Sequence, residues 1–191
     1  MGAMTLSTRI TLVRVALIPV LVALLAAADR RPGLLVAALV VFGVAAATDW
    51  LDGWLARRWQ QVTDLGNFLD TTADKLLVVG ALLGLMTLGR ADVWVVFVVV
   101  ARELAVLGLR AAAASAAVVV SASIWGKLKF GVQALGVGLA ILRPRVELGP
   151  LLLDQWLLIV VAVVTALSAV DYFARFGELL GLDRGKGRVA K

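Results

Sequence analysis

The sequence predicts an all-α integral membrane protein with six transmembrane helices and both termini in the cytoplasm. Hydrophobic residues make up 62% of the 191 positions, and the mean hydropathy is +0.98. Soluble domains are only about 45–50% apolar, so this excess indicates a lipid-facing surface. The apolar residues also fall into separate stretches, and the basic residues gather between alternate stretches. We expect one six-helix transmembrane domain over residues 1–176, followed by a basic and flexible tail over 177–191.

Six apolar stretches are compared with the roughly 20 residues that a helix needs to cross a bilayer. In order they are Ile10–Ala28, Leu34–Trp50, Ala73–Leu88, Val93–Ala114, Phe130–Leu142 and Leu151–Val170. The second, third and fifth are short, and we expect polar residues to continue these helices into the headgroup region.

Turn-forming residues separate the stretches at three connections. These are Asp29-Arg30-Arg31-Pro32-Gly33, Gly89-Arg90 and Arg143-Pro144-Arg145. With six spans, both termini share one side of the membrane with the second-to-third and fourth-to-fifth connections. The opposite side has only the basic residues Arg30, Arg31, Arg90, Arg143 and Arg145 of the 19 Lys and Arg. The positive-inside rule therefore places both termini in the cytoplasm of a multi-pass cell-membrane protein. The net charge of +6 then indicates contact with anionic headgroups, not with nucleic acid.

Two absent residue types limit the chemistry. The chain has neither Cys nor His, which excludes disulfides, thiolate nucleophiles and the commonest general base. Any bound metal must therefore be held by oxygen, which favours Mg²⁺, Mn²⁺ or Ca²⁺.

Four aspartates occur in two helically spaced pairs. Asp49 and Asp52 are three residues apart, and Asp70 and Asp74 are four apart, so each pair shares a helix face. The short connection between them predicts antiparallel neighbouring helices, with the two pairs facing each other at the cytoplasmic end. Such converging carboxylates repel each other unless cations neutralise them, and four carboxylates can bridge two divalent ions. A pair of ions about 4 Å apart can stabilise both the attacking and the leaving oxygen of a phosphoryl transfer.

Small residues near these aspartates would let a ligand approach the backbone; they are Gly53, Ala56 and Gly66. Each feature alone also has a simpler explanation, because single aspartates at helix ends are usually solvated and small residues usually mark close helix packing. The combination at these spacings favours a binding site.

The run Asp49-x2-Asp52-Gly53-x2-Ala56-Arg57-x8-Gly66-x3-Asp70-x3-Asp74 resembles the signature of the CDP-alcohol phosphotransferase family at every fixed position. The resemblance implies that family's six-helix and usually homodimeric fold, which transfers a phosphatidyl group from a CDP-lipid to an alcohol and releases CMP.

The resemblance also implies roles for individual residues. Asp49 and Asp70 would bridge two divalent cations, Mg²⁺ or Mn²⁺, while Asp52 completes the first site and Asp74 the second. Asp74 would also take the proton from the acceptor hydroxyl. The residues implied to surround the cytidine diphosphate are Gly53, Ala56, Arg57, Thr63, Gly66, Thr11 and Arg14.

Further basic residues bear on the identity of the acceptor. Arg102, Arg110, Lys127 and Lys129 lie in or beside apolar stretches, where an anionic acceptor would need them. They can also be read as snorkelling anchors, and Arg102 can simply pair with Glu103. The Ala-Arg-Glu, Gly-Leu-Arg and Gly-Lys-x-Lys segments resemble the branch of the family that makes phosphatidylglycerophosphate from CDP-diacylglycerol and glycerol 3-phosphate.

The sequence departs from that branch at Phe130, where Thr is usual, and at Ser7-Thr8-Arg9, which replace a Pro-Asn pair. Phosphatidylglycerol, as in cardiolipin synthesis, and inositol phosphate therefore remain alternative acceptors. Outside the family, a cation transporter is the other class considered, although transport sites usually lie near the bilayer midplane.

Overall fold

The computed structural model describes the backbone of residues 6–59, 64–115 and 124–179, and the side chains of residues 10–48, 69, 71–115 and 129–174. Within these ranges the chain forms six α-helices and one two-stranded hairpin. The helices are α1 Leu6–Ala27, α2 Leu34–Trp59, α3 Asp64–Thr87, α4 Val93–Ser115, α5 Ile124–Leu142 and α6 Leu153–Leu179. Each predicted apolar stretch lies mainly within one helix, which confirms the all-helical expectation.

The helices α2 and α3 are longer than their apolar stretches. α2 continues past Trp50 to Trp59, and α3 begins at Asp64 instead of Ala73. The polar residues of these extensions lower the hydropathy without interrupting the helical backbone, so hydropathy alone underestimates both helices. The extensions place Asp52 on α2 with Asp49, and Asp70 on α3 with Asp74.

The start of the sixth element differs from the prediction. Leu151 and Leu152, expected to open a helix, instead form strand β2 (Leu151–Leu152), which pairs antiparallel with β1 (Glu147–Leu148). Gly149 and Pro150 connect the strands, and Gly149 has φ 69°, the left-handed value that a type II′ turn needs at its first central position. The turn chemistry therefore overrides the apolar pattern, and α6 begins after the hairpin.

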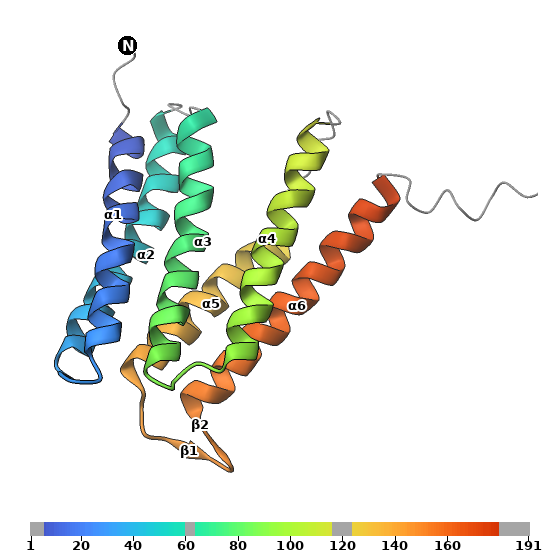
Figure 1. Cartoon of the computed structure of the whole chain (residues 1–191). Helices are drawn as coiled ribbons and strands as arrows, with labels where there is room; N and C mark the ends of the chain where they lie inside the picture. Colours follow the sequence, from blue (N-terminus) through green and yellow to red (C-terminus); the bar gives the residue numbers. More distant parts are fainter. Residues whose placement is uncertain (1–5, 60–63, 116–123, 180–191) are drawn as a thin grey trace, which may run out of the picture.

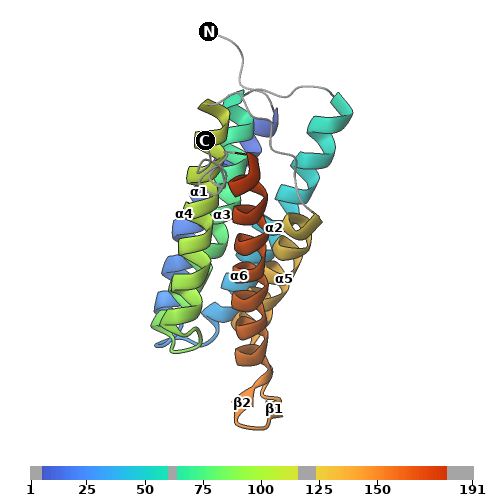
Figure 2. The same cartoon turned by 90° about the vertical axis from the view of Figure 1, so that its right-hand side faces the viewer.

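The helices form an elongated bundle in which α1, α2 and α3 lie side by side and α4 and α6 lean away from them (Figure 1). α5 crosses behind, packing against α6 and α2, while α4 also packs against α6. α1 and α3 begin, and α2, α4 and α6 end, at one end of the bundle; the hairpin projects from the other end (Figures 1 and 2). We call these the site end and the hairpin end.

Glycines allow the closest helix contacts. A Cβ atom at Gly84 of α3 would lie 2.7 Å from Cβ and Cδ1 of Leu25 on α1, and one at Gly80 would lie 3.0 Å from Ile18. A Cβ at Gly136 of α5 would lie 2.6 Å from Val161 on α6. The absence of side chains here lets the backbones approach, as small residues commonly do in membrane helices.

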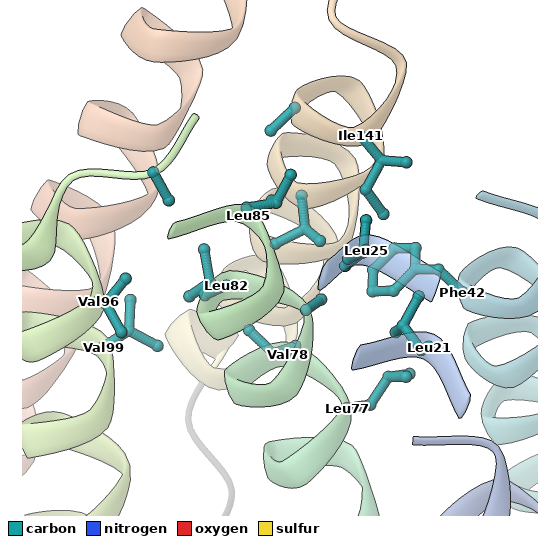
Figure 3. Close-up of a cluster of buried hydrophobic side chains, with 14 of the residues drawn as sticks. Leu21, Leu25, Phe42, Leu77, Val78, Leu82, Leu85, Val96, Val99 and Ile141 are labelled. Carbon is teal, nitrogen blue, oxygen red and sulfur yellow. The ribbon is translucent and has the colours of Figure 1, made fainter. Parts of the chain in front are cut away.

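The buried side chains change in character along the bundle. The main apolar core, which includes Leu25, Phe42, Leu85 and Ile141 (Figure 3), lies toward the hairpin end. On each helix that carries both kinds, the buried polar side chains lie further toward the site end than the residues of this core; they are Thr11, Arg14, Arg102, Glu103, Lys129, Gln133, Thr165 and Ser168. Asp154, in the first turn of α6, is the exception at the hairpin end.

The outer surface is apolar, as a membrane protein requires. Large hydrophobic side chains such as Trp94 (71% exposed), Val36 and Leu104 face outward from α4 and α2. By length and composition, Ile10–Ala27 and Leu153–Ala174 are each able to cross a membrane, while Leu34–Thr48 and Lys129–Leu142 are shorter apolar helices. Together these features favour a membrane protein.

Candidate active site

The four aspartates of the motif lie on adjacent helices. α2 contacts α3, and α2 ends and α3 begins at the site end, where the end of α2 leans away from the start of α3 (Figures 1 and 2). This backbone arrangement agrees with the predicted antiparallel pair. The side chains of Asp49, Asp52 and Asp70 lie outside the described residues, so the predicted convergence of all four carboxylates stays a prediction.

Asp74 is the member of the set whose side chain is described. Its carboxylate is 28% exposed, and its Oδ1 accepts a hydrogen bond from Arg14 Nη1 at 3.4 Å. Arg14 comes from α1 and is completely buried, as is nearly all of Thr11 one turn earlier. The two α1 residues predicted to line the nucleotide site therefore lie inside the bundle, and one of them contacts the predicted catalytic aspartate.

A group of four cations gathers around Lys75, the residue that follows Asp74. We define the basic cluster as Lys75 of α3, Arg102 and Arg110 of α4, and Lys129 of α5. Lys75 lies within electrostatic range of Asp74 and of the other three members. Its Nζ donates to the Thr71 carbonyl oxygen at 2.7 Å, which holds the side chain near the start of α3.

Glu103 joins two members of the basic cluster. Arg102 Nη1 donates to Oε2 and Oε1 of Glu103 at 3.1 and 3.3 Å, and Lys129 Nζ contacts Oε1 of the same carboxylate. Arg102 Nη2 also donates to the Ser168 hydroxyl of α6 at 2.9 Å. All four residues are buried, so the charges compensate one another in a region with little water. The pairing of Arg102 with Glu103, which the sequence offered as an alternative to acceptor binding by Arg102, is thus observed.

Arg110 is held differently from Arg102. Its Nε donates to the Tyr172 hydroxyl oxygen at 2.8 Å, and its guanidinium carbon lies 5.6 Å from the centre of the Tyr172 ring. Tyr172 is buried on α6, whereas Arg110 is exposed. One end of the arginine is therefore anchored while the rest stays accessible to a ligand.

Sequence reasoning did not assign Lys75, Glu103, Ser168 or Tyr172 to the site. Tyr172 could have been singled out because it is the only tyrosine of the chain and lies at the end of an apolar stretch. Ser168 carried no such signal, because its partner Arg102 is 66 residues away.

Several predicted site residues lie outside the described side chains. They are Gly53, Ala56, Arg57, Gly66 and Lys127, which lie on described helix backbones, and Thr63, which lies in an undescribed connection. Their assignments stay predictions.

The donor chemistry fits a hard divalent cation. Asp74 supplies a carboxylate at an accessible, polar position, and a chain without His or Cys offers mainly oxygen ligands. Among the described side chains, no three acidic residues form a cluster, so the number and identity of the ions remain to be proposed.

Comparison with known proteins identifies related sequences. Residues 4–167 match the family described as CDP-alcohol phosphatidyltransferase. The chain is 36% identical to the CDP-diacylglycerol–glycerol-3-phosphate 3-phosphatidyltransferase of Bacillus subtilis, over 92% of this chain and 96% of that protein. It is 38% identical to the probable phosphatidylglycerophosphate synthase of Mycobacterium tuberculosis, over 89% of this chain and 80% of that protein.

A relative from Haemophilus influenzae, also named CDP-diacylglycerol–glycerol-3-phosphate 3-phosphatidyltransferase, is 34% identical over 70% of this chain and 73% of its own length. The family match covers most of the chain, including the aspartate motif and the basic cluster. This chain therefore belongs to the CDP-alcohol phosphatidyltransferase family of membrane-embedded enzymes.

Proposed function

We propose that this enzyme transfers the phosphatidyl group of CDP-diacylglycerol to glycerol 3-phosphate, giving phosphatidylglycerophosphate and CMP. The observation that carries the choice of acceptor is the basic cluster around Lys75, next to Asp74, which offers four cations and, among the side chains that the structure describes, one buried counterion, Glu103. A phosphate monoester is the kind of group that such an excess of Arg and Lys donors holds. The names of the bacterial relatives support the same pair of substrates.

In the proposed reaction, Asp74 accepts the proton of the acceptor hydroxyl. The resulting alkoxide oxygen forms a bond to the phosphorus that carries the diacylglycerol group, and the bond from that phosphorus to the oxygen of CMP breaks. Arg14 holds the Asp74 carboxylate, and the basic cluster would hold the acceptor phosphate. CMP leaves with the electron pair of the broken bond.

Members of the family need divalent cations. We propose two Mg²⁺ or Mn²⁺ ions bound by Asp49, Asp52, Asp70 and Asp74, which when present stabilise the negative charge of the pyrophosphate. The residues proposed to hold the cytidine diphosphate are those implied by the family motif; they are Gly53, Ala56, Arg57, Thr63, Gly66, Thr11 and Arg14.

The proposed setting is the cell membrane, crossed six times, with both termini and the site end on the cytoplasmic side. This orientation follows the distribution of basic residues. It would also give the site access to water-soluble glycerol 3-phosphate while CDP-diacylglycerol stays in the bilayer. A homodimer is proposed from the family resemblance alone.

Replacing Asp74 tests the reaction. We expect Asp74→Asn to abolish CMP release from CDP-diacylglycerol and glycerol 3-phosphate in purified, Mg²⁺-supplied protein, because an amide cannot accept the proton. The matched control is Asp92→Asn at the hairpin end, where the side chain only caps α4 through the Trp94 amide at 2.8 Å and an asparagine can do the same. Turnover retained in Asp74→Asn would refute its role.

Offering single acceptors tests the substrate. Wild-type protein should release CMP with glycerol 3-phosphate and not with phosphatidylglycerol or inositol phosphate. Release with one of the latter alone would reassign the acceptor within the family. Cation flux into sealed liposomes without any CMP release would instead support a transporter.

A further inference from the structure

Glu103 occupies a position that the proposed reaction does not by itself explain. Its carboxylate carries negative charge into a site that should attract a phosphate, yet it is only 6% exposed and lies between Arg102 and Lys129. An acidic residue here would oppose binding of the acceptor unless it serves another purpose.

The contacts of Glu103 indicate that purpose. Arg102 on α4 and Lys129 on α5 share this one carboxylate, so Glu103 fixes two flexible side chains from different helices relative to each other. Ser168 of α6 binds the other terminal nitrogen of Arg102, which adds a third helix to the arrangement. Long basic side chains otherwise lose considerable rotamer freedom when they bind a ligand.

The same contacts leave donors unused. A lysine ammonium has three N–H donors, and Glu103 occupies one side of the Lys129 group. Arg102 Nε is buried and has no hydrogen-bond acceptor among the described residues. Buried donors without partners are costly, so these atoms are suited to an anionic ligand that supplies the missing acceptors.

We propose that Glu103 is a positioning residue for the acceptor: its buried carboxylate holds Lys129 and Arg102 together, with their remaining donors available to the phosphate of glycerol 3-phosphate. This inference rests on the proposed function and deepens it. Glu103 acts through the two cations and does not touch the reacting atoms, so its loss should weaken acceptor binding more than it slows the chemical step at Asp74.

The test compares the kinetics of Glu103→Gln with those of wild type. We expect the KM for glycerol 3-phosphate to rise about tenfold or more, as expected for losing hydrogen bonds between charged groups. The kcat and the KM for CDP-diacylglycerol should stay within about threefold of wild type. An acceptor KM close to wild type, or an equal rise in both KM values, would overturn the proposal.

A matched control separates positioning from stability. Gln133 Nε2 donates to the Thr165 hydroxyl at 3.1 Å, which is another buried polar contact between α5 and α6 but lies outside the basic cluster. Thr165→Val removes this contact at nearly constant volume, so it should lower the melting temperature while leaving both KM values unchanged. If Thr165→Val raised the acceptor KM as much as Glu103→Gln, the effect would belong to helix packing.

A second variant covers the case in which Glu103→Gln does not fold. Glu103→Asp keeps the charge but withdraws the carboxylate by one methylene, and we expect an acceptor KM between those of wild type and Glu103→Gln. A wild-type acceptor KM in Glu103→Asp, together with an unfolded Glu103→Gln, would limit Glu103 to stabilising the fold. Absence of CMP release from wild-type protein with glycerol 3-phosphate would instead count against the proposed function itself.

Discussion

Tyr172 shows how one residue can control a cation on another helix. Its hydroxyl accepts a hydrogen bond from Arg110 while its ring lies beside the guanidinium. We predict that Tyr172→Phe raises the KM for glycerol 3-phosphate about threefold to tenfold, because one hydrogen bond of roughly 1 kcal/mol is lost while the ring contact remains. Steady-state measurement of CMP release at varied acceptor concentration checks this value.

The control for Tyr172 is its neighbour Phe173, which is 49% exposed on the outer surface. Phe173→Leu should leave the acceptor KM unchanged. If both substitutions changed KM equally, the tyrosine would act through the position of α6 and not through Arg110.

At the level of single residues, the sequence predicted the site unevenly. The aspartates and the nearby small residues follow a local spacing, so they could be proposed as site residues without coordinates. The contacts of Arg102 with Ser168 and of Arg110 with Tyr172 join residues more than 60 positions apart. No local pattern encodes such a pair, because the helix packing alone brings the partners together.

At the scale of the elements, the contact between α1 and α3 depends on Gly84. We predict that Gly84→Ala lowers the melting temperature in detergent, since the new Cβ would lie 2.7 Å from Leu25 and overpacking typically costs about 1–3 kcal/mol. Thermal unfolding followed by circular dichroism measures the shift.

Gly43 of α2 provides the comparison for Gly84. A Cβ at this exposed position has nothing within 4 Å, so Gly43→Ala should be neutral or slightly stabilising through better helix propensity. An equal loss of thermal stability in both variants would mean that close packing at Gly84 is not the cause.

The helices themselves were largely predictable, and their ends were not. Apolar stretches located all six helices, although three of the stretches are shorter than a bilayer requires, because a lipid-facing helix must be apolar over most of its length. The ends of α2 and α3 continue through charged residues that carry no hydropathy signal. The hairpin depends on the Gly149-Pro150 turn. It was not predicted because Leu151 and Leu152, directly after the turn, were assigned to the following apolar stretch.

At the scale of the whole molecule, the proposed orientation can be measured directly. The chain has no cysteine, so a single introduced thiol can be labelled without background. We predict that Arg145→Cys, near the hairpin, reacts with a membrane-impermeant maleimide in intact cells. Ser115→Cys, at the end of α4, should react only after permeabilisation. The opposite pattern would place the site end outside the cell.

The separation of the apolar core from the buried polar groups has a consequence for how this enzyme can change. Substitutions among the core leucines toward the hairpin end should lower the thermal stability, with little effect on which alcohol the enzyme uses. Substitutions around the buried charges should alter substrate choice, and those that keep the charges paired should do so with less loss of stability than those that break a pair. Related enzymes could therefore evolve to use a new acceptor through changes around the buried charges, while the apolar core keeps the helical fold.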